Sequence, residues 1–256
     1  MIYSGIFDTH SHYDDEKFND DRAEVLSSLK MNGVCGVIDC GCDVVSSKKA
    51  VELSEAYDFI YAAVGIHPHD AADAQNDDID KIIKLFSKKK VVAVGEIGLD
   101  YHYDFSPREV QLEFFEKQII LSKEYDLPII VHDRESHEDT INLLKRYEPK
   151  GVVHCFSGSA EMAKEVLKIG MYIGLGGAVT FKNARKPLEV AAIVPDDRLL
   201  LETDCPYMAP VPLRGNRCDS SMISYTAQKL AEVRSCDVQE LIDLCRLNAE
   251  KLFKLQ

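Results

Sequence analysis

The chain has 256 residues, of which 46% are hydrophobic and 29% charged, a composition typical of an ordinary soluble globular protein. Its net charge of −13 argues against a polyanionic partner, because Lys and Arg drive non-specific nucleic-acid binding; carboxylates that hold divalent cations would weaken this objection. No apolar run approaches the ~18 residues of a membrane span and the N-terminus lacks the basic segment of a signal peptide, so we expect a cytoplasmic protein that does not bind membranes.

Eight short apolar runs follow one another along the chain. They are rich in Val, Ile and Gly and lack strict polar alternation, as expected of strands that are buried on both faces. The runs are residues 5–10, 34–40, 59–67, 91–98, 128–132, 151–156, 171–177 and 198–204. Eight cysteines follow no Cys-x-x-Cys spacing, which predicts small buried side chains in a reducing compartment rather than a structural metal site.

Segments with helical periodicity separate most of these runs. We expect helices over residues 20–31, 46–57 (with Ser46 as its cap), 108–125, 136–147, 159–169, 220–234 and 237–254. Repeated strand–helix alternation favours a closed parallel barrel, the α/β (β/α)₈ or TIM barrel, whose typical length of roughly 250 residues this chain matches. We therefore predict one barrel domain over residues 1–256, and an open doubly wound sheet is the alternative.

The expected strands end, one after another, in residue types that bind metals. These are His10 and His12 at the first, His67 and His69 at the third, Glu96 in the fourth, His132 and His154 at the fifth and sixth, and Glu202 and Asp204 at the eighth. In a barrel of parallel strands, all the C-terminal strand ends meet at one mouth, so these side chains should converge there. Seven of the eight histidines lie at or just past such ends, a concentration that purely structural roles do not explain.

The His10-x-His12 pair is the strongest single signal. Residues two apart on a strand point the same way, so both imidazoles can reach one ion. The set mixes imidazole and carboxylate without thiolate, which suits Zn, Mn, Fe, Ni or Mg. Four imidazoles and two carboxylates exceed the needs of one tetrahedral ion, which makes a site for two divalent ions plausible, with Glu96 as the bridging carboxylate.

With these residues identified, the sequence resembles the TatD family of metal-dependent deoxyribonucleases, within the amidohydrolase-like barrels. The resemblance covers essentially the whole chain. It is carried by FDTHSH (7–12), GIHPH (65–69), GEIGLDYH (95–102), PIIVHDR (128–134), HCFSG (154–158) and ETDCPYMAPVPLRGNR (202–217). It implies a divalent-metal-dependent hydrolase that acts on DNA, including 3′ ends, with metal ligands at His10, His12, Glu96, His132, His154 and Asp204.

Two motifs depart from the family pattern. The fifth strand continues as His132-Asp133-Arg134-Glu135 where the family usually has His-Ser-Arg-Asp, and the late basic loop ends Arg217-Cys218-Asp219-Ser220 instead of Arg-Asn-Glu-Pro. Both differences spare the expected ligands. They bear on substrate preference more than on catalysis.

The chemistry expected of these residues is attack on phosphorus by a water that divalent ions activate. We expect His10, His12 and Glu96 to hold one ion, and Glu96, His132, His154 and Asp204 to hold or help to hold the second. Asp204 is the expected base. Glu202 is an alternative base, a positioning partner or part of a plain salt bridge.

Cations that could bind phosphate lie near the same strand ends. Arg214 and Arg217 lie in a loop where Gly215 lets the backbone approach a ligand, and His67 and Arg134 are further candidates. The aromatic residues Tyr101, Tyr103 and Phe105 after the fourth strand either stack on a nucleobase or pack the loop.

Three activities are compatible with this set of residues. The first is a nuclease that acts as a monomer on single-stranded DNA or 3′ ends. The second is a hydrolase of small amides, or of esters such as aminoacyl-tRNA, and the two arginines argue against a neutral substrate. The third is a non-catalytic nucleic-acid-binding barrel, against which the full ligand set and the acidic charge both argue.

Overall fold

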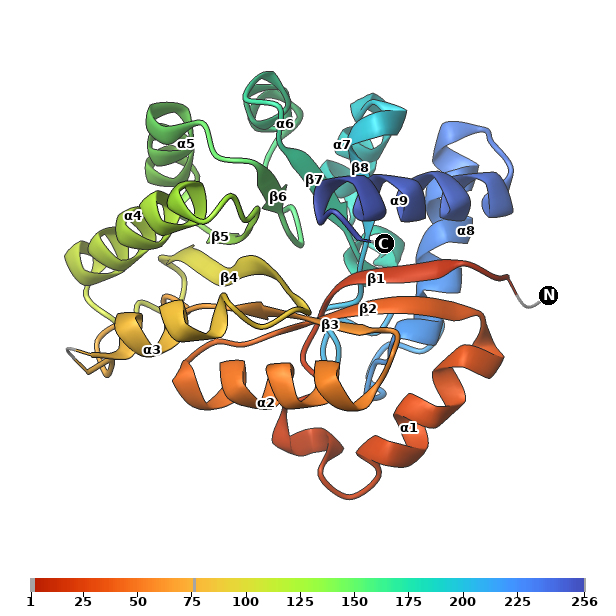
Figure 1. The fold of residues 1–256 in the computed structure, drawn as a ribbon. Helices are drawn as coiled ribbons and strands as arrows, with labels where there is room; N and C mark the ends of the chain where they lie inside the picture. The colour runs from red at the N-terminus through yellow and green to blue at the C-terminus, as the bar shows by residue number, and fades with distance from the viewer. Residues whose placement is uncertain (1–2, 76, 256) are drawn as a thin grey trace.

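The computed structural model describes residues 3–75 and 77–255, which form a barrel of parallel strands surrounded by helices (Figure 1). The strands are β1 (Ile6–Ser11), β2 (Val34–Cys40), β3 (Ile60–Val64), β4 (Val91–Asp100), β5 (Ile129–Arg134), β6 (Gly151–Val153), β7 (Tyr172–Leu175) and β8 (Leu199–Leu201). Each strand pairs in parallel with the next one along the chain, in the order β1 to β8. This order has no switch point of the kind that a doubly wound sheet requires, so the barrel prediction is confirmed.

The barrel closes between its last and first strands by a short seam of hydrogen bonds. The backbone N–H of Asp204 donates to the His10 carbonyl at 3.0 Å, and that of His12 donates to the Cys205 carbonyl at 2.7 Å. Beneath them, the Thr203 hydroxyl donates to a carboxylate oxygen of the buried Asp8 at 2.6 Å. The seam therefore joins the end of β1 to the segment that follows β8 at the mouth of the barrel, beside the expected ligands.

Nine helices are described outside the strands. They are α1 (Arg22–Leu29), α2 (Val44–Ala56), α3 (Asp78–Leu85), α4 (Arg108–Glu124), α5 (His137–Tyr147), α6 (Ala160–Lys168), α7 (Arg185–Ile193), α8 (Ile223–Arg234) and α9 (Val238–Leu252). Short 3₁₀ helices cover Glu16–Phe18, Lys30–Asn32, Gly177–Thr180, Asp196–Arg198 and Ser220–Met222.

The sequence prediction missed two of these helices, assigned the wrong cap to a third, and began α1 and α8 two and three residues too early. Helix α3 has only eight residues and one buried side chain, so its apolar pattern is short. Helix α7 contains Pro187, which reads as a helix breaker but lies in the first turn, where a missing N–H costs nothing. Helix α2 begins at Val44 rather than Ser46, because Asp43 is the cap and Ser46 completes a capping box with it.

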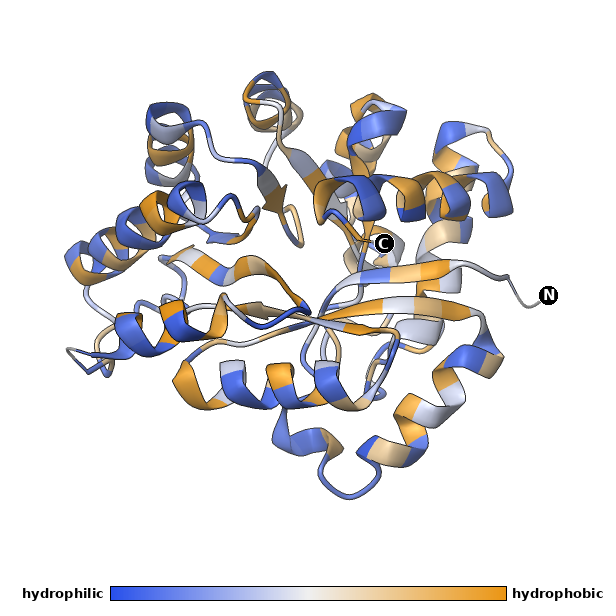
Figure 2. Cartoon of the chain, in the orientation of Figure 1, coloured by the Kyte–Doolittle hydropathy of each residue, from blue (hydrophilic) through white to orange (hydrophobic). Residues whose placement is uncertain are grey.

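The apolar residues form a layer inside the barrel and another beneath the helices. Phe7, Val92 and Tyr172, near the starts of their strands, pack with Leu252 and Phe253 at the end of α9. The last helix therefore closes the end of the barrel opposite the mouth. Figure 2 shows hydrophobic residues, in orange, along the strands and in stripes along the helices. Such stripes are expected of helices that bury only one side against the barrel.

Two further findings bear on the sequence predictions. Over the ranges 3–75 and 77–255, no helix is both long enough and apolar enough to cross a membrane. All eight cysteines are free thiols, four of them buried.

Candidate metal centre

Irregularities in two strands turn ligand side chains into the mouth. Between β1 and β2 the register runs from Asp8 opposite Val37 to Ser11 opposite Asp39, so β1 carries one extra residue at Thr9–His10. The β4–β5 pairing shifts in the same way on either side of Glu96. An extra residue bends a strand and re-aims the side chain that it carries. The imidazole of His10 and the carboxylate of Glu96 thereby face each other, with Nε2 and Oε2 3.3 Å apart.

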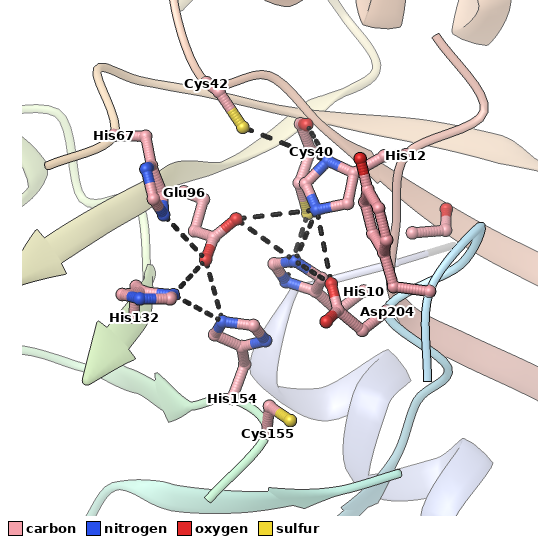
Figure 3. Close-up of polar contacts among 12 residues, drawn as sticks. His10, His12, Cys40, Cys42, His67, Glu96, His132, His154, Cys155 and Asp204 are labelled. Carbon is pink, nitrogen blue, oxygen red and sulfur yellow. Dashed lines mark hydrogen bonds and ion pairs between the residues drawn. The ribbon is translucent and has the colours of Figure 1, made fainter. Parts of the chain in front are cut away.

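One group of donor atoms gathers around the Glu96 Oε2 atom (Figure 3). The Nε2 atoms of His10 and His12 lie 3.0 Å from each other and 3.3 and 3.5 Å from this oxygen. The Asp204 Oδ1 atom lies 3.7 and 3.5 Å from the same two nitrogens. Asp204 follows β8 with a φ of 62°, in the left-handed region that residues other than glycine seldom adopt, and its N–H bond to His10 holds it there. These four side chains surround one point.

A second group surrounds the other oxygen of the same carboxylate. Glu96 Oε1 lies 2.8 Å from His132 Nδ1 and 2.8 Å from His154 Nε2. Glu96, His132 and His154 each offer a ligand atom within 4.8 Å of the other two, as do His10, His12 and Glu96. Glu96 thus presents one oxygen to each of two sets of imidazole nitrogens.

Hydrogen bonds behind the rings fix which nitrogen of each imidazole carries the proton. His12 Nδ1 lies 2.8 Å from the Cys40 carbonyl, and His132 Nε2 lies 3.0 Å from Asp100 Oδ2. Because carbonyl and carboxylate oxygens only accept, these nitrogens donate. When these rings are neutral, the opposite ring nitrogens of His12 and His132, which face Glu96, carry the lone pair that a metal ion would use.

Asp100 is a functional candidate that the site prediction missed. Its side chain is fully buried, and its Oδ2 also accepts from His69 Nε2 at 2.8 Å. Its Oδ1 accepts the backbone N–H groups of His102 at 3.0 Å and Tyr103 at 2.9 Å. The available signal was its position as the last residue of the Glu96 strand. One carboxylate thus orients an imidazole of the cluster and the loop that follows β4.

The charges of the cluster depend on one another. Burial alone would raise the pKa of Glu96, but the imidazoles of His154, His67 and His10 outweigh it and hold that pKa well below its ordinary value. Burial lowers the pKa of His10 to about 4, so this ring is neutral. The pKa values of His12 and His154 are raised above the ordinary value and that of His132 is raised to about 9, so metal binding would displace protons from these rings.

Glu202 lies behind the cluster rather than in it. Its Oε1 accepts the N–H of Cys155 and lies 3.8 Å from His154 Nδ1, on the side of the ring that faces away from Glu96. Its Oε2 has no hydrogen-bond partner among the described residues, and burial raises its pKa to about 8. The glycine at 174 leaves room for it, since a Cβ there would lie 2.4 Å from Oε2. Of the acidic residues predicted to be catalytic, Asp204 is the most accessible, with 23% of its side chain exposed.

His67 directs a hydrogen-bond donor into the site. Its Nδ1 accepts the backbone N–H of His69 at 3.1 Å, so the ring proton lies on Nε2, which is 3.4 Å from Glu96 Oε1. Burial lowers the pKa of His67 to about 4. The ring is therefore a neutral donor at neutral pH and lacks a free lone pair on the atom that faces the cluster.

The three predicted arginines occupy different surroundings. The guanidinium of Arg134 lies 4.6 Å over the Tyr103 ring and that of Arg214 lies 4.1 Å over the Phe181 ring. Arg217 instead donates both terminal nitrogens to Asp21, and one of them to the Lys17 carbonyl as well. No hydrogen bond or ion pair joins these arginines to the Glu96 cluster among the described residues, so phosphate binding stays a prediction for them.

A (β/α)₈ barrel whose mouth gathers four imidazoles and two carboxylates around two points is the architecture of a metal-dependent hydrolase. The model of the TatD-related DNase family matches residues 7–254. The chain belongs to this family and is a metal-dependent hydrolase.

The names of similar proteins agree with this assignment. The chain is 45% identical to the uncharacterized metal-dependent hydrolase YabD of Bacillus subtilis, over 98% of this chain and 99% of that one. It is 32% identical to the 3′-5′ ssDNA/RNA exonuclease TatD of Erwinia tasmaniensis, over 98% and 100% of the two chains. The crystal structure of YjjV, a TatD homologue from Escherichia coli, superimposes with a TM-score of 0.93 at 32% identity, over the whole of both chains.

Proposed function

We propose that this enzyme hydrolyses phosphodiester bonds of single-stranded DNA or RNA from the 3′ end, with two divalent cations. The observation that carries the proposal is the Glu96 carboxylate, whose two oxygens each face a separate set of imidazole nitrogens at the mouth of the barrel. Paired ions suit phosphoryl transfer, in which an attacking and a leaving oxygen both need stabilisation. The relatives named as 3′-5′ ssDNA/RNA exonucleases support the same substrate class.

The donor atoms fit divalent ions. We assign His10, His12 and Glu96 to one ion and Glu96, His132 and His154 to the other. Asp204 goes with the first ion rather than the second, because its carboxylate lies beside His10 and His12. Imidazole and carboxylate together accommodate Mg, Mn, Zn or Ni. When bound, the ions supply Lewis acidity to a water and to the phosphoryl oxygens.

The side chains around the ions have separate tasks. Asp204 accepts the proton of the attacking water, because its carboxylate is ionised and more accessible than that of Glu96 or Glu202. His67 donates a hydrogen bond from its Nε2–H to a phosphoryl oxygen. Glu202 and Asp100 lie behind metal ligands and position them, as outer-shell carboxylates do. Every side chain in this set comes from one chain, so the proposed activity requires no second subunit.

The test is a panel assay of protein stripped of metal and reloaded with each divalent cation. The substrates are single-stranded DNA and RNA labelled at either end, aminoacyl-tRNA and a small amide. We expect mononucleotides to be released from the 3′ end, and Asp204→Asn to lose about 10²- to 10⁴-fold in kcat, the range for a general base. Glu135→Gln, at an exposed carboxylate, is the control variant. Activity on the amide or the aminoacyl ester without cleavage of either strand would contradict the proposal.

A further inference from the structure

Two aromatic rings lie stacked and exposed on the loop between β4 and α4. The ring centroids of Tyr103 and Phe105 are 5.1 Å apart and their planes differ by 15°. Tyr103 is 47% exposed and Phe105 is 65% exposed. Large apolar side chains that lie together on a surface mark a binding site more often than isolated ones do.

The loop around these rings is held in place by contacts on several sides. The edge of His69 packs against both rings, with centroid distances of 5.4 Å to Tyr103 and 4.9 Å to Phe105. The Tyr103 N–H donates to the buried Asp100 at 2.9 Å. Asp104, which separates Tyr103 from Phe105 in the sequence, accepts two hydrogen bonds from Arg108, at 3.0 and 2.8 Å. These contacts hold the loop in the conformation that leaves both rings exposed.

The stacked pair is continuous with the metal centre. His69 supports both rings and shares the Asp100 carboxylate with His132, a proposed ligand. The rings of His67 and His69 lie 4.4 Å apart, and His67 reaches Glu96. The aromatic surface thus begins where the ligand cluster ends, at the same rim of the barrel.

A cation completes this surface. The guanidinium of Arg134, which ends β5, lies 4.6 Å over the Tyr103 ring and has no carboxylate within ion-pair distance among the described residues. In a chain with a net charge of −13, an exposed and unpaired arginine beside the active site attracts an anion. Flat rings next to such a cation match a nucleobase and its own phosphate.

We propose that Tyr103, Phe105 and Arg134 form a stacking subsite that holds a nucleobase of a single strand beside the scissile phosphodiester. The inference rests on the proposed nuclease function and adds a specificity to it. Because every base has a π face, the subsite accepts any base sequence. It discriminates against duplex ends, whose bases are already stacked and paired on their neighbours.

The experiment compares kinetics on a single-stranded oligonucleotide with kinetics on an abasic deoxyribose-phosphate oligomer of the same length, a phosphodiester without any aromatic ring. For Phe105→Leu and Tyr103→Leu we expect the KM for the strand to rise, and the ratio of the two kcat/KM values to fall about fivefold to a hundredfold. That range corresponds to the loss of one stacked base. Tyr103→Phe keeps the ring and should restore the ratio. Tyr125→Leu is the matched control, because Tyr125 is also 47% exposed but precedes β5, at the opposite end of the barrel.

A second measurement locates the base. Oligonucleotides with an abasic spacer at each of the last three positions are tested for binding to the wild type and to Phe105→Leu. One spacer should weaken binding to the wild type and have a smaller effect on the variant, so that the two changes are not additive. Equal losses on the strand and on the abasic oligomer, or additive effects at every spacer, would overturn the subsite. Absence of phosphodiester cleavage by the wild type would instead overturn the proposed function.

Discussion

Replacement of Asp100 by Asn tests whether a carboxylate behind the cluster sets its metal affinity. The Oδ1 atom of Asp100 accepts two backbone N–H groups, so the Asn carbonyl must take that place. The Asn amide then faces the Nε2 atoms of His132 and His69, which lie 3.0 and 2.8 Å from Oδ2. To accept a hydrogen bond there, His132 must move its proton to Nδ1. That is the atom 2.8 Å from Glu96 Oε1, and its lone pair would be lost to the metal.

The expected cost follows from this loss of one ligand atom. Outer-shell partners of metal-bound histidines are worth about 10- to 100-fold in metal affinity, or about 1.4 to 2.7 kcal/mol. Titration calorimetry of the stripped protein with Mn²⁺ measures this, and circular dichroism checks that the variant is folded. Asp133→Asn is the matched control, since Asp133 is also buried and accepts from His137 at 2.7 Å, outside the site. A folded Asp100→Asn protein whose Mn²⁺ affinity lies within about twofold of the wild type would refute the reasoning.

Three further predictions concern the same mouth. Gly174→Ala places a Cβ 2.4 Å from Glu202 Oε2, so we expect overpacking of about 1–3 kcal/mol, seen as a lower Tm, together with weaker metal binding; a variant with unchanged Tm and affinity would show that Glu202 has free space. Hydrogen bonds to Asp100 and Glu96 outweigh burial and raise the pKa of His132 to about 9. Metal loading at neutral pH should therefore displace a proton from this ring, and the metal affinity should fall as the pH drops below about 9. Calorimetry in two buffers of different ionisation enthalpy checks this, and identical heats would contradict it. Because Arg217 is paired with Asp21, Arg217→Ala and Asp21→Asn should each lower stability only slightly in chemical denaturation and change the strand KM alike; a larger KM effect of Arg217→Ala alone would restore its role as a phosphate ligand.

The sequence predicted those parts of the site that depend on strand order. Once eight strands alternate with helices, the barrel geometry alone brings His10, Glu96, His132, His154 and Asp204 to one mouth. No particular spacing between these residues in the sequence is needed for them to meet. The eight strand predictions matched because fully buried parallel strands have a strong apolar signature.

A sequence pattern could not predict the roles that depend on distances between individual side chains in the folded protein. Glu202 and Asp204 lie two residues apart, yet the chain leaves β8 at Leu201 and turns, so one carboxylate lies behind His154 and the other faces the opening. The sequence left the role of Glu202 open for this reason. Likewise, Arg217 and Asp21 are 196 positions apart, and no local pattern reveals that they pair.

The seam between β8 and β1 has a consequence for the order in which the molecule is made. The His10 carbonyl and the Asp204 N–H bond to each other across that seam, and both residues belong to the metal centre. A chain grows from its N-terminus, so every residue up to Asp204 must leave the ribosome before Asp204 can meet His10. The last helix then closes the far end of the barrel through Leu252 and Phe253. The proposed activity therefore requires the strand β8 and the segment that follows it, and a chain terminated before Asp204 lacks the proposed base.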